Sequence, residues 1–142
     1  MSVYADTSFL VSLYVLDANS ARAAAQMKAV KLPVLLTPLG QLELANALYL
    51  RVFRKELVPS RINTAHALFI KDIEDGIFEL RSLSQTVYDR AKLIARKHTL
   101  HLGTRTLDVL HVASALVLQA KAFYTFDRNQ EKLAGAEGLV VP

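Results

Sequence analysis

Short apolar runs alternate with longer stretches of helical periodicity along this chain. Each run is bounded by polar residues, proline or glycine, as expected of strands buried on both faces of a sheet. The predicted strands are residues 2–5, 33–37, 77–80, 122–126 and 139–141. The predicted helices are residues 7–15, 20–29, 39–55, 60–74, 84–98 and 106–119, with a short helix before the last strand. This alternation indicates an α/β fold with a mostly parallel, five-stranded sheet.

Composition narrows the class of protein. Hydrophobic residues make up 52% of the 142 residues and no linker interrupts them, so we expect a single domain over residues 1–142. The chain has no cysteine, which excludes a disulfide scaffold and thiolate metal sites. It has no apolar run of about 20 residues and no signal-peptide pattern, so we expect a cytoplasmic protein without a membrane span. The net charge of +4 weakly favours a polyanionic partner.

Four acidic residues lie among apolar neighbours, where a carboxylate is costly unless it is paired or bound to a metal. They are Asp6, Glu43, Asp108 and Asp127. Two of them follow predicted strands and two lie near the start of predicted helices. Ligands of parallel sheets bind outside the carboxyl ends of the strands, so we expect the four to line one pocket. An all-oxygen donor set of this kind suits Mg²⁺ or Mn²⁺.

Several segments resemble the motifs of PIN-domain ribonucleases. Residues 4–11, Tyr-Ala-Asp-Thr-Ser-Phe-Leu-Val, resemble the first strand and turn of that family. Residues 105–113 look like its helix with the second aspartate, and residues 125–127 are similar to its Thr-x-Asp ending on the fourth strand. Glu43 stands where the family has its helical glutamate. The order and spacing of these motifs suit the VapC-type toxins of VapBC toxin–antitoxin pairs.

The resemblance implies a three-layer α/β/α PIN-like domain that cleaves single-stranded or loop RNA by metal-assisted hydrolysis. It makes Asp6, Glu43, Asp108 and Asp127 the catalytic acids and the ligands of Mg²⁺ or Mn²⁺. The expected substrate-binding residues are Arg105, Ser8 and Asn129. The expected partners are RNA, a small VapB-type antitoxin and a second copy in a homodimer. One departure is Ser12, where many relatives place a lysine, which leaves the substrate contacts near the first helix open.

Each candidate also has a structural interpretation. Asp6 and Asp127 would each cap the helix that follows, although Thr7 or Ser8 is equally able to cap the first helix. Asp108 would be a first-turn acid that interacts favourably with the positive end of the helix dipole. Glu43 would pair with an arginine. His111, one turn after Asp108 on an apolar helix, is expected to be a hydrogen-bonded core residue.

Three other functions compete with the nuclease. A haloacid dehalogenase-like phosphatase requires a second aspartate where this chain has Ser8. A receiver-like domain requires paired acids after the first strand and a lysine after the last, and neither is present. A degenerate PIN-fold module that binds RNA or protein without catalysis is disfavoured by the four intact acids.

Overall fold

A four-stranded parallel sheet organises the computed structural model, which describes all residues from 1 to 142. The strand order is β3-β2-β1-β4, so the first strand of the chain is central. The strands are β1 (Val3–Ala5), β2 (Val34–Leu36), β3 (Phe78–Leu80) and β4 (Ala122–Tyr124). The helices are α1 (Thr7–Tyr14), α2 (Ser20–Ala29), α3 (Pro38–Phe53), α4 (Pro59–Glu74), α5 (Gln85–Leu102), α6 (Thr106–Val117) and α7 (Arg128–Ala136). The predicted α/β class with a parallel sheet is confirmed.

The prediction of a fifth strand is wrong. Residues 139–141 form one isolated parallel bridge, in which Val140 pairs with Ala122. Gly138, at a φ of 86°, turns the chain out of α7 immediately before this stretch, and Pro142, which has no N–H group, follows it. Too little extended chain remains for a full strand.

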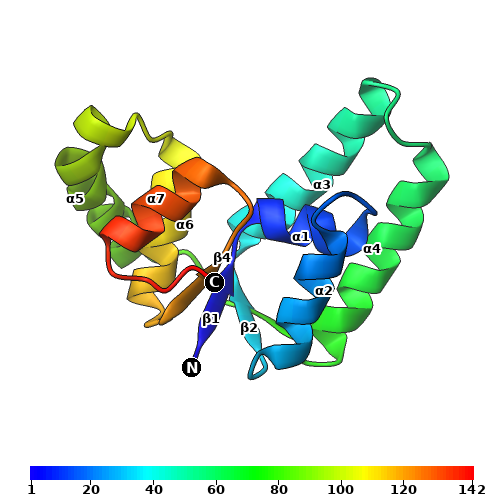
Figure 1. The fold of residues 1–142 in the computed structure, drawn as a ribbon, viewed down its shortest axis with the longest axis horizontal. Helices are drawn as coiled ribbons and strands as arrows, with labels where there is room; N and C mark the ends of the chain where they lie inside the picture. The colour runs from blue at the N-terminus through cyan, green and yellow to red at the C-terminus, as the bar shows by residue number, and fades with distance from the viewer.

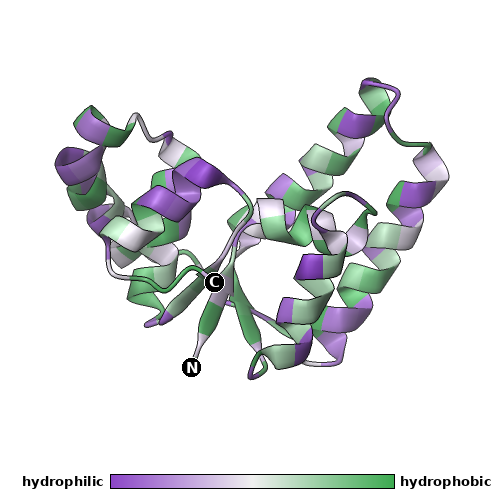
Figure 2. Cartoon of the chain, in the orientation of Figure 1, coloured by the Kyte–Doolittle hydropathy of each residue, from purple (hydrophilic) through white to green (hydrophobic).

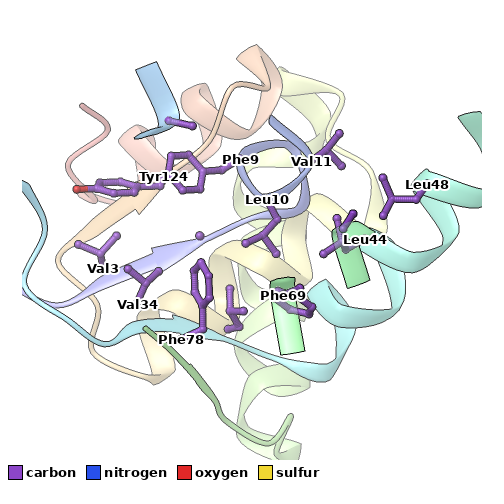
Figure 3. Packing of buried hydrophobic residues seen from close by; sticks show 14 of the residues in the cluster. Val3, Phe9, Leu10, Val11, Val34, Leu44, Leu48, Phe69, Phe78 and Tyr124 are labelled. Carbon is purple, nitrogen blue, oxygen red and sulfur yellow. The ribbon is translucent and has the colours of Figure 1, made fainter. Parts of the chain in front are cut away.

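Helices cover both faces of the sheet. Figure 1 shows α1 to α4 gathered on one side and α5, α6 and α7 on the other. Because successive strand residues point to opposite faces, Val3 and Ala5 enter the core under α1 to α4, while Tyr4 enters the core under α5 to α7. Figure 3 shows the first core, where Leu10, Leu44 and other apolar side chains pack over the sheet.

Hydropathy follows this layering. In Figure 2 the central strands are hydrophobic, and the helices alternate between hydrophobic and hydrophilic residues. Strands β1, β2 and β4 are fully buried, which explains why they appear in the sequence as uninterrupted apolar runs. No helix combines the length and the apolar character that a membrane span requires.

Turn and cap residues fix where the helices begin and end. Pro38 and Pro59 stand in the first turns of α3 and α4, where a missing N–H group costs nothing. Gly103, with a φ of 63°, ends α5 in the left-handed conformation that glycine adopts most easily. Asp6, rather than Thr7 or Ser8, caps α1 by accepting a hydrogen bond from the backbone N of Phe9.

Candidate active site

The four candidate acids lie at the edge of the sheet where the parallel strands end. Asp6 directly follows β1, and Asp127 follows the neighbouring strand β4 after two residues. Glu43 lies in the second turn of α3, the helix that leaves β2. Asp108 is in the first turn of α6. Elements from both helical layers therefore deliver acids to one edge of the sheet.

Asp6 is buried, and both of its carboxylate oxygens accept hydrogen bonds. Its Oδ1 accepts hydrogen bonds from the hydroxyl of Ser8 at 2.7 Å and from the backbone N of Phe9 at 3.1 Å. Its Oδ2 accepts one from the hydroxyl of Thr125 at 2.6 Å. Burial raises the pKa of Asp6 even though these hydrogen bonds favour the ionised form. Asp6 therefore sits in an environment that favours loss of its charge or a cationic partner.

Thr125 connects Asp6 to Asp127. Its hydroxyl donates to Asp6 and accepts a hydrogen bond from the backbone N of Asp127 at 3.0 Å. Asp127 in turn caps α7, since its Oδ1 accepts from the backbone N atoms of Asn129 at 2.8 Å and Gln130 at 3.1 Å. The Thr-x-Asp spacing thus lets one hydroxyl bind the first acid and orient the segment with the second.

Glu43 is half-buried and is held through a single oxygen. Its Oε1 accepts hydrogen bonds from the hydroxyl of Thr7 at 2.8 Å and from Nε2 of His111. Burial alone would raise the pKa of Glu43, but the hydrogen bonds and the favourable charge of His111 outweigh it and lower the pKa. Glu43 is therefore ionised near neutral pH. No arginine pairs with it, so the arginine ion-pair interpretation is wrong.

A buried tyrosine supports His111 from behind. The hydroxyl of Tyr4 lies 2.7 Å from Nδ1 of His111, and both residues are buried. Burial raises the pKa of Tyr4 far above its ordinary value, so the hydroxyl keeps its proton. Because a hydroxyl can donate or accept, Tyr4 can hold Nδ1 of His111 while Nε2 donates to Glu43. The prediction that His111 is a hydrogen-bonded core residue is confirmed, and its partner is a candidate catalytic acid.

Asp108 is held by a backbone hydrogen bond and lies within the electrostatic influence of Asp127. Oδ2 of Asp108 accepts a hydrogen bond from the backbone N of Arg105 at 3.1 Å, as a first-turn acid does. Burial raises the pKa of Asp108, and the negative charge of Asp127 raises it further. The negative charge of Asp127 is therefore near enough to disfavour the ionised form of Asp108.

The donor chemistry fits a hard divalent cation. Three carboxylate oxygens accept no hydrogen bond: Oε2 of Glu43, Oδ1 of Asp108 and Oδ2 of Asp127. Free carboxylate oxygens without sulfur or free imidazole ligands suit Mg²⁺ or Mn²⁺. As placed, however, no three acidic or histidine side chains are grouped to hold one ion. A shared metal site stays a prediction that requires these side chains to turn toward each other.

The expected substrate-binding residues have different environments. Ser8 is committed to the site itself, because its hydroxyl donates to Asp6 and accepts from the backbone N of Phe126 at 2.9 Å. Arg105 is exposed at the start of α6, and its guanidinium forms no ion pair. Asn129 is exposed at the start of α7 with its side chain free of hydrogen bonds. Arg105 and Asn129 are therefore open to a substrate, whereas Ser8 positions Asp6.

Sequence reasoning gave no site role to several side chains that hold the acids. Thr7 and Thr125 bond to the acids directly, Tyr4 acts through His111, and His111 itself was expected only in the core. Signals for the two threonines were present, since Thr7 follows Asp6 directly and Thr125 precedes Asp127 by two residues. Nothing in the sequence indicated that Tyr4 and His111 would meet, because they are 107 residues apart.

Comparison with known proteins places this architecture in a family. The PIN domain model matches residues 3–136, so the chain belongs to the PIN domain family. No curated protein matches the chain. Among solved structures, VapC20 of Mycobacterium tuberculosis, described as a "Sarcin-Ricin loop cleaving toxin", is similar with a TM-score of 0.73 at 17% identity, covering 98% of this chain and 97% of that one.

Two further structures share the fold. FitAcB from Neisseria gonorrhoeae has a TM-score of 0.68 at 18% identity, covering 98% of this chain and 95% of that chain. A toxin–antitoxin complex from Klebsiella pneumoniae has a TM-score of 0.65 at 16% identity, covering 99% of this chain and 96% of that chain. At these identities the structural similarity establishes the fold alone, and the chemistry has to be inferred from the site residues.

Proposed function

We propose that this chain is an Mg²⁺- or Mn²⁺-dependent endoribonuclease that hydrolyses phosphodiester bonds of single-stranded or loop RNA. The observation that carries the proposal is the placement of Asp6, Glu43, Asp108 and Asp127 at one edge of the sheet, three of them with a free oxygen. Carboxylates that repel each other in this way favour a cation between them.

The residues have separate tasks under this proposal. Glu43, Asp108 and Asp127 would hold the cation through their free oxygens, and Asp6 would add charge from the buried side. When bound, the cation would neutralise charge on the phosphate and lower the pKa of the attacking water. Thr7 and His111 fix Oε1 of Glu43, which leaves Oε2 as the oxygen that is free to turn. Arg105 and Asn129, at the exposed starts of α6 and α7, would contact the RNA beside the acids.

The biological setting we propose is that of the toxin of a type II toxin–antitoxin pair, acting in the cytoplasm. Two of the structures that share this fold are described as a toxin and as a toxin–antitoxin complex, which supports this setting. A small VapB-type antitoxin would then block the acidic edge, and we expect the active form to be a homodimer. Expression of the parent chain should slow cell growth, whereas Asp6→Ala at equal soluble expression should not.

Cleavage of single-stranded RNA by the purified chain tests the proposal. We expect cleavage with Mn²⁺, none in EDTA, and a loss of about 100-fold or more in Asp108→Asn, since one charge-stabilising group contributes about 10²–10³ in rate. A degenerate PIN module that only binds RNA would show no metal-dependent cleavage in the parent chain. That result would refute the proposal.

Thermal unfolding separates loss of the metal site from loss of the fold. At a metal concentration about 100 times the dissociation constant, binding stabilises a protein by roughly 2.7 kcal/mol. The parent chain should therefore unfold several degrees higher with Mn²⁺. Asp108→Asn should remain folded and lose most of that shift. An equal shift in both proteins would show that Asp108 is not a ligand.

A further inference from the structure

A cleft of about 430 Å³ opens beside the acidic edge, between α1, the loop that follows it and the C-terminal half of α3. Thr7 and Ser8 line one end of the cleft, and their hydroxyls bond to Glu43 and Asp6. Arg51 and Arg54 line the opposite wall. Figure 1 shows how this wall arises, because α3 and α4 project together away from the sheet beyond α1. The cleft therefore connects directly with the site.

Both arginines are without a partner. Neither Arg51 nor Arg54 forms an ion pair or a side-chain hydrogen bond. Arg51 is in the last turn of α3 and Arg54 is the residue that follows the helix, and both line the same cleft. Asp17, the one acid that lines the cleft, accepts hydrogen bonds from Ser12, Ser20 and the backbone N of Asn19. The cationic wall is thus free to bind an anion.

The aromatic residue of the cleft is not open to a nucleobase. Phe126 lines the cleft, but its ring stacks on Phe9 with centroids 5.5 Å apart. The guanidinium of Arg22 lies 5.5 Å from the centroid of the same ring. A base would need a free ring face for stacking. The available chemistry is therefore that of two guanidinium groups, which suits phosphates.

We propose that this cleft binds the phosphodiester backbone of the RNA strand on one side of the cut, with Arg51 and Arg54 contacting phosphates. The inference rests on the proposed function, because the strand enters the cleft only if its scissile phosphate lies at the acids. Recognition through phosphates without base stacking makes this part of the interface tolerant of sequence. Arg51 and Arg54 also supply cationic groups near α1, where the uncharged Ser12 provides none.

RNA binding in EDTA tests the cleft without cleavage. Affinity for a labelled single-stranded RNA would be measured across salt concentrations for the parent chain, Arg54→Gln and Arg51→Gln/Arg54→Gln. Each lost phosphate contact should reduce the slope of log K against log salt by about 0.7, or about fourfold in affinity at 0.15 M salt. The double variant should therefore lose about 1.4 in slope. Arg54 is exposed, so Arg54→Gln alone must show half of this effect if the double variant folds poorly.

Arg96→Gln is the matched control. Arg96 is an exposed arginine without an ion pair on α5, in the other helical layer, so the same substitution there should leave affinity and slope unchanged. An unchanged salt slope in Arg51→Gln/Arg54→Gln overturns the inference. That result is expected if a protein partner, rather than RNA, occupies the cleft. An equal loss in Arg96→Gln overturns it too, by placing the RNA on α5.

The two proposals fail in different ways. If RNA binding depends on Arg51 and Arg54 but no metal supports cleavage, the cleft is correct and the nuclease is not. If the chain cleaves RNA with Mn²⁺ and the double variant keeps the parent KM and salt slope, the nuclease is correct and the cleft is not.

Discussion

The pKa of Asp108 reports directly on the electrostatic influence of a neighbouring acid. This pKa is raised by burial and by the negative charge of Asp127. A raised pKa means that folded Asp108 binds its proton more tightly than unfolded Asp108 does. The free energy of unfolding of the metal-free protein therefore falls as pH rises from the ordinary pKa of 3.8 through the raised value.

Asp127→Asn should lower the pKa of Asp108, because it removes that negative charge and keeps the shape of the side chain. Carbon NMR titration of the Asp108 carboxyl in the metal-free protein measures the shift. The pH dependence of unfolding should flatten in the same variant. An unchanged pKa would mean that Asp127 exerts no electrostatic effect on Asp108.

His111 is buried and bonded to Glu43, so we expect it to act on Glu43 rather than on the substrate. His111→Leu removes the donor to Oε1 of Glu43 and leaves the hydroxyl of Tyr4 with only the long contact to Thr37, at 3.4 Å. Loss of a group that orients a metal ligand costs about 10–100-fold in activity or metal affinity. His111→Gln should recover part of the loss, because its amide can still donate to Glu43. Cleavage rates and Mn²⁺ affinity would be compared, and a loss in His111→Leu as large as in Asp6→Ala would contradict this role.

At the scale of residues, the sequence indicated the candidate acids but not the side chains that hold them. An acid among apolar residues is visible in a sequence, and this is why Asp6 and Asp108 became candidates. The capping interpretation also proved correct for Asp6 and Asp127, since both accept backbone hydrogen bonds from the helices that follow. The bond between Glu43 and His111 joins residues that are 68 apart in the sequence, so only the tertiary fold brings them together.

At the scale of elements, the apolar periodicity predicted where the helices lie, and glycine and proline residues determine where elements end. The helix predicted to end at residue 98 continues to Leu102 as α5, because nothing before Gly103 interrupts it. The prediction relied on apolar spacing and overlooked the glycine. Residues 139–141 have the apolar character of a strand, but Gly138 and Pro142 leave room for one bridge only.

Two glycines offer a paired test of these element ends. Gly103→Ala should reduce the free energy of unfolding by about 1 kcal/mol, since alanine is strained at a φ of 63°. Gly135→Ala, within α7 and with no atom within 4 Å of the added carbon, should increase it by about 0.5–1 kcal/mol. Urea unfolding of both variants measures the difference. Effects of the same sign would contradict the assigned backbone conformations.

At the scale of the whole molecule, the candidate site lies where the two helical layers meet. One layer delivers Glu43 on α3 and the other delivers Asp108 and His111 on α6. The central strand β1 contributes Tyr4 to the core on one face, and it ends at Asp6. This explains why acids far apart in the sequence gather at one edge. It also predicts that the site depends on the integrity of both layers.

The ends of the RNA product test the central claim most directly. A metal site activates water, whereas a histidine-driven ribonuclease uses the 2′-hydroxyl of the substrate and leaves a cyclic phosphate. His111 is buried and bound to Glu43 and Tyr4, so it is not placed to act as that base. We therefore predict 5′-phosphate and 3′-hydroxyl ends with Mn²⁺ and no products in EDTA. Cyclic phosphate ends, or full activity in EDTA, would contradict the mechanism.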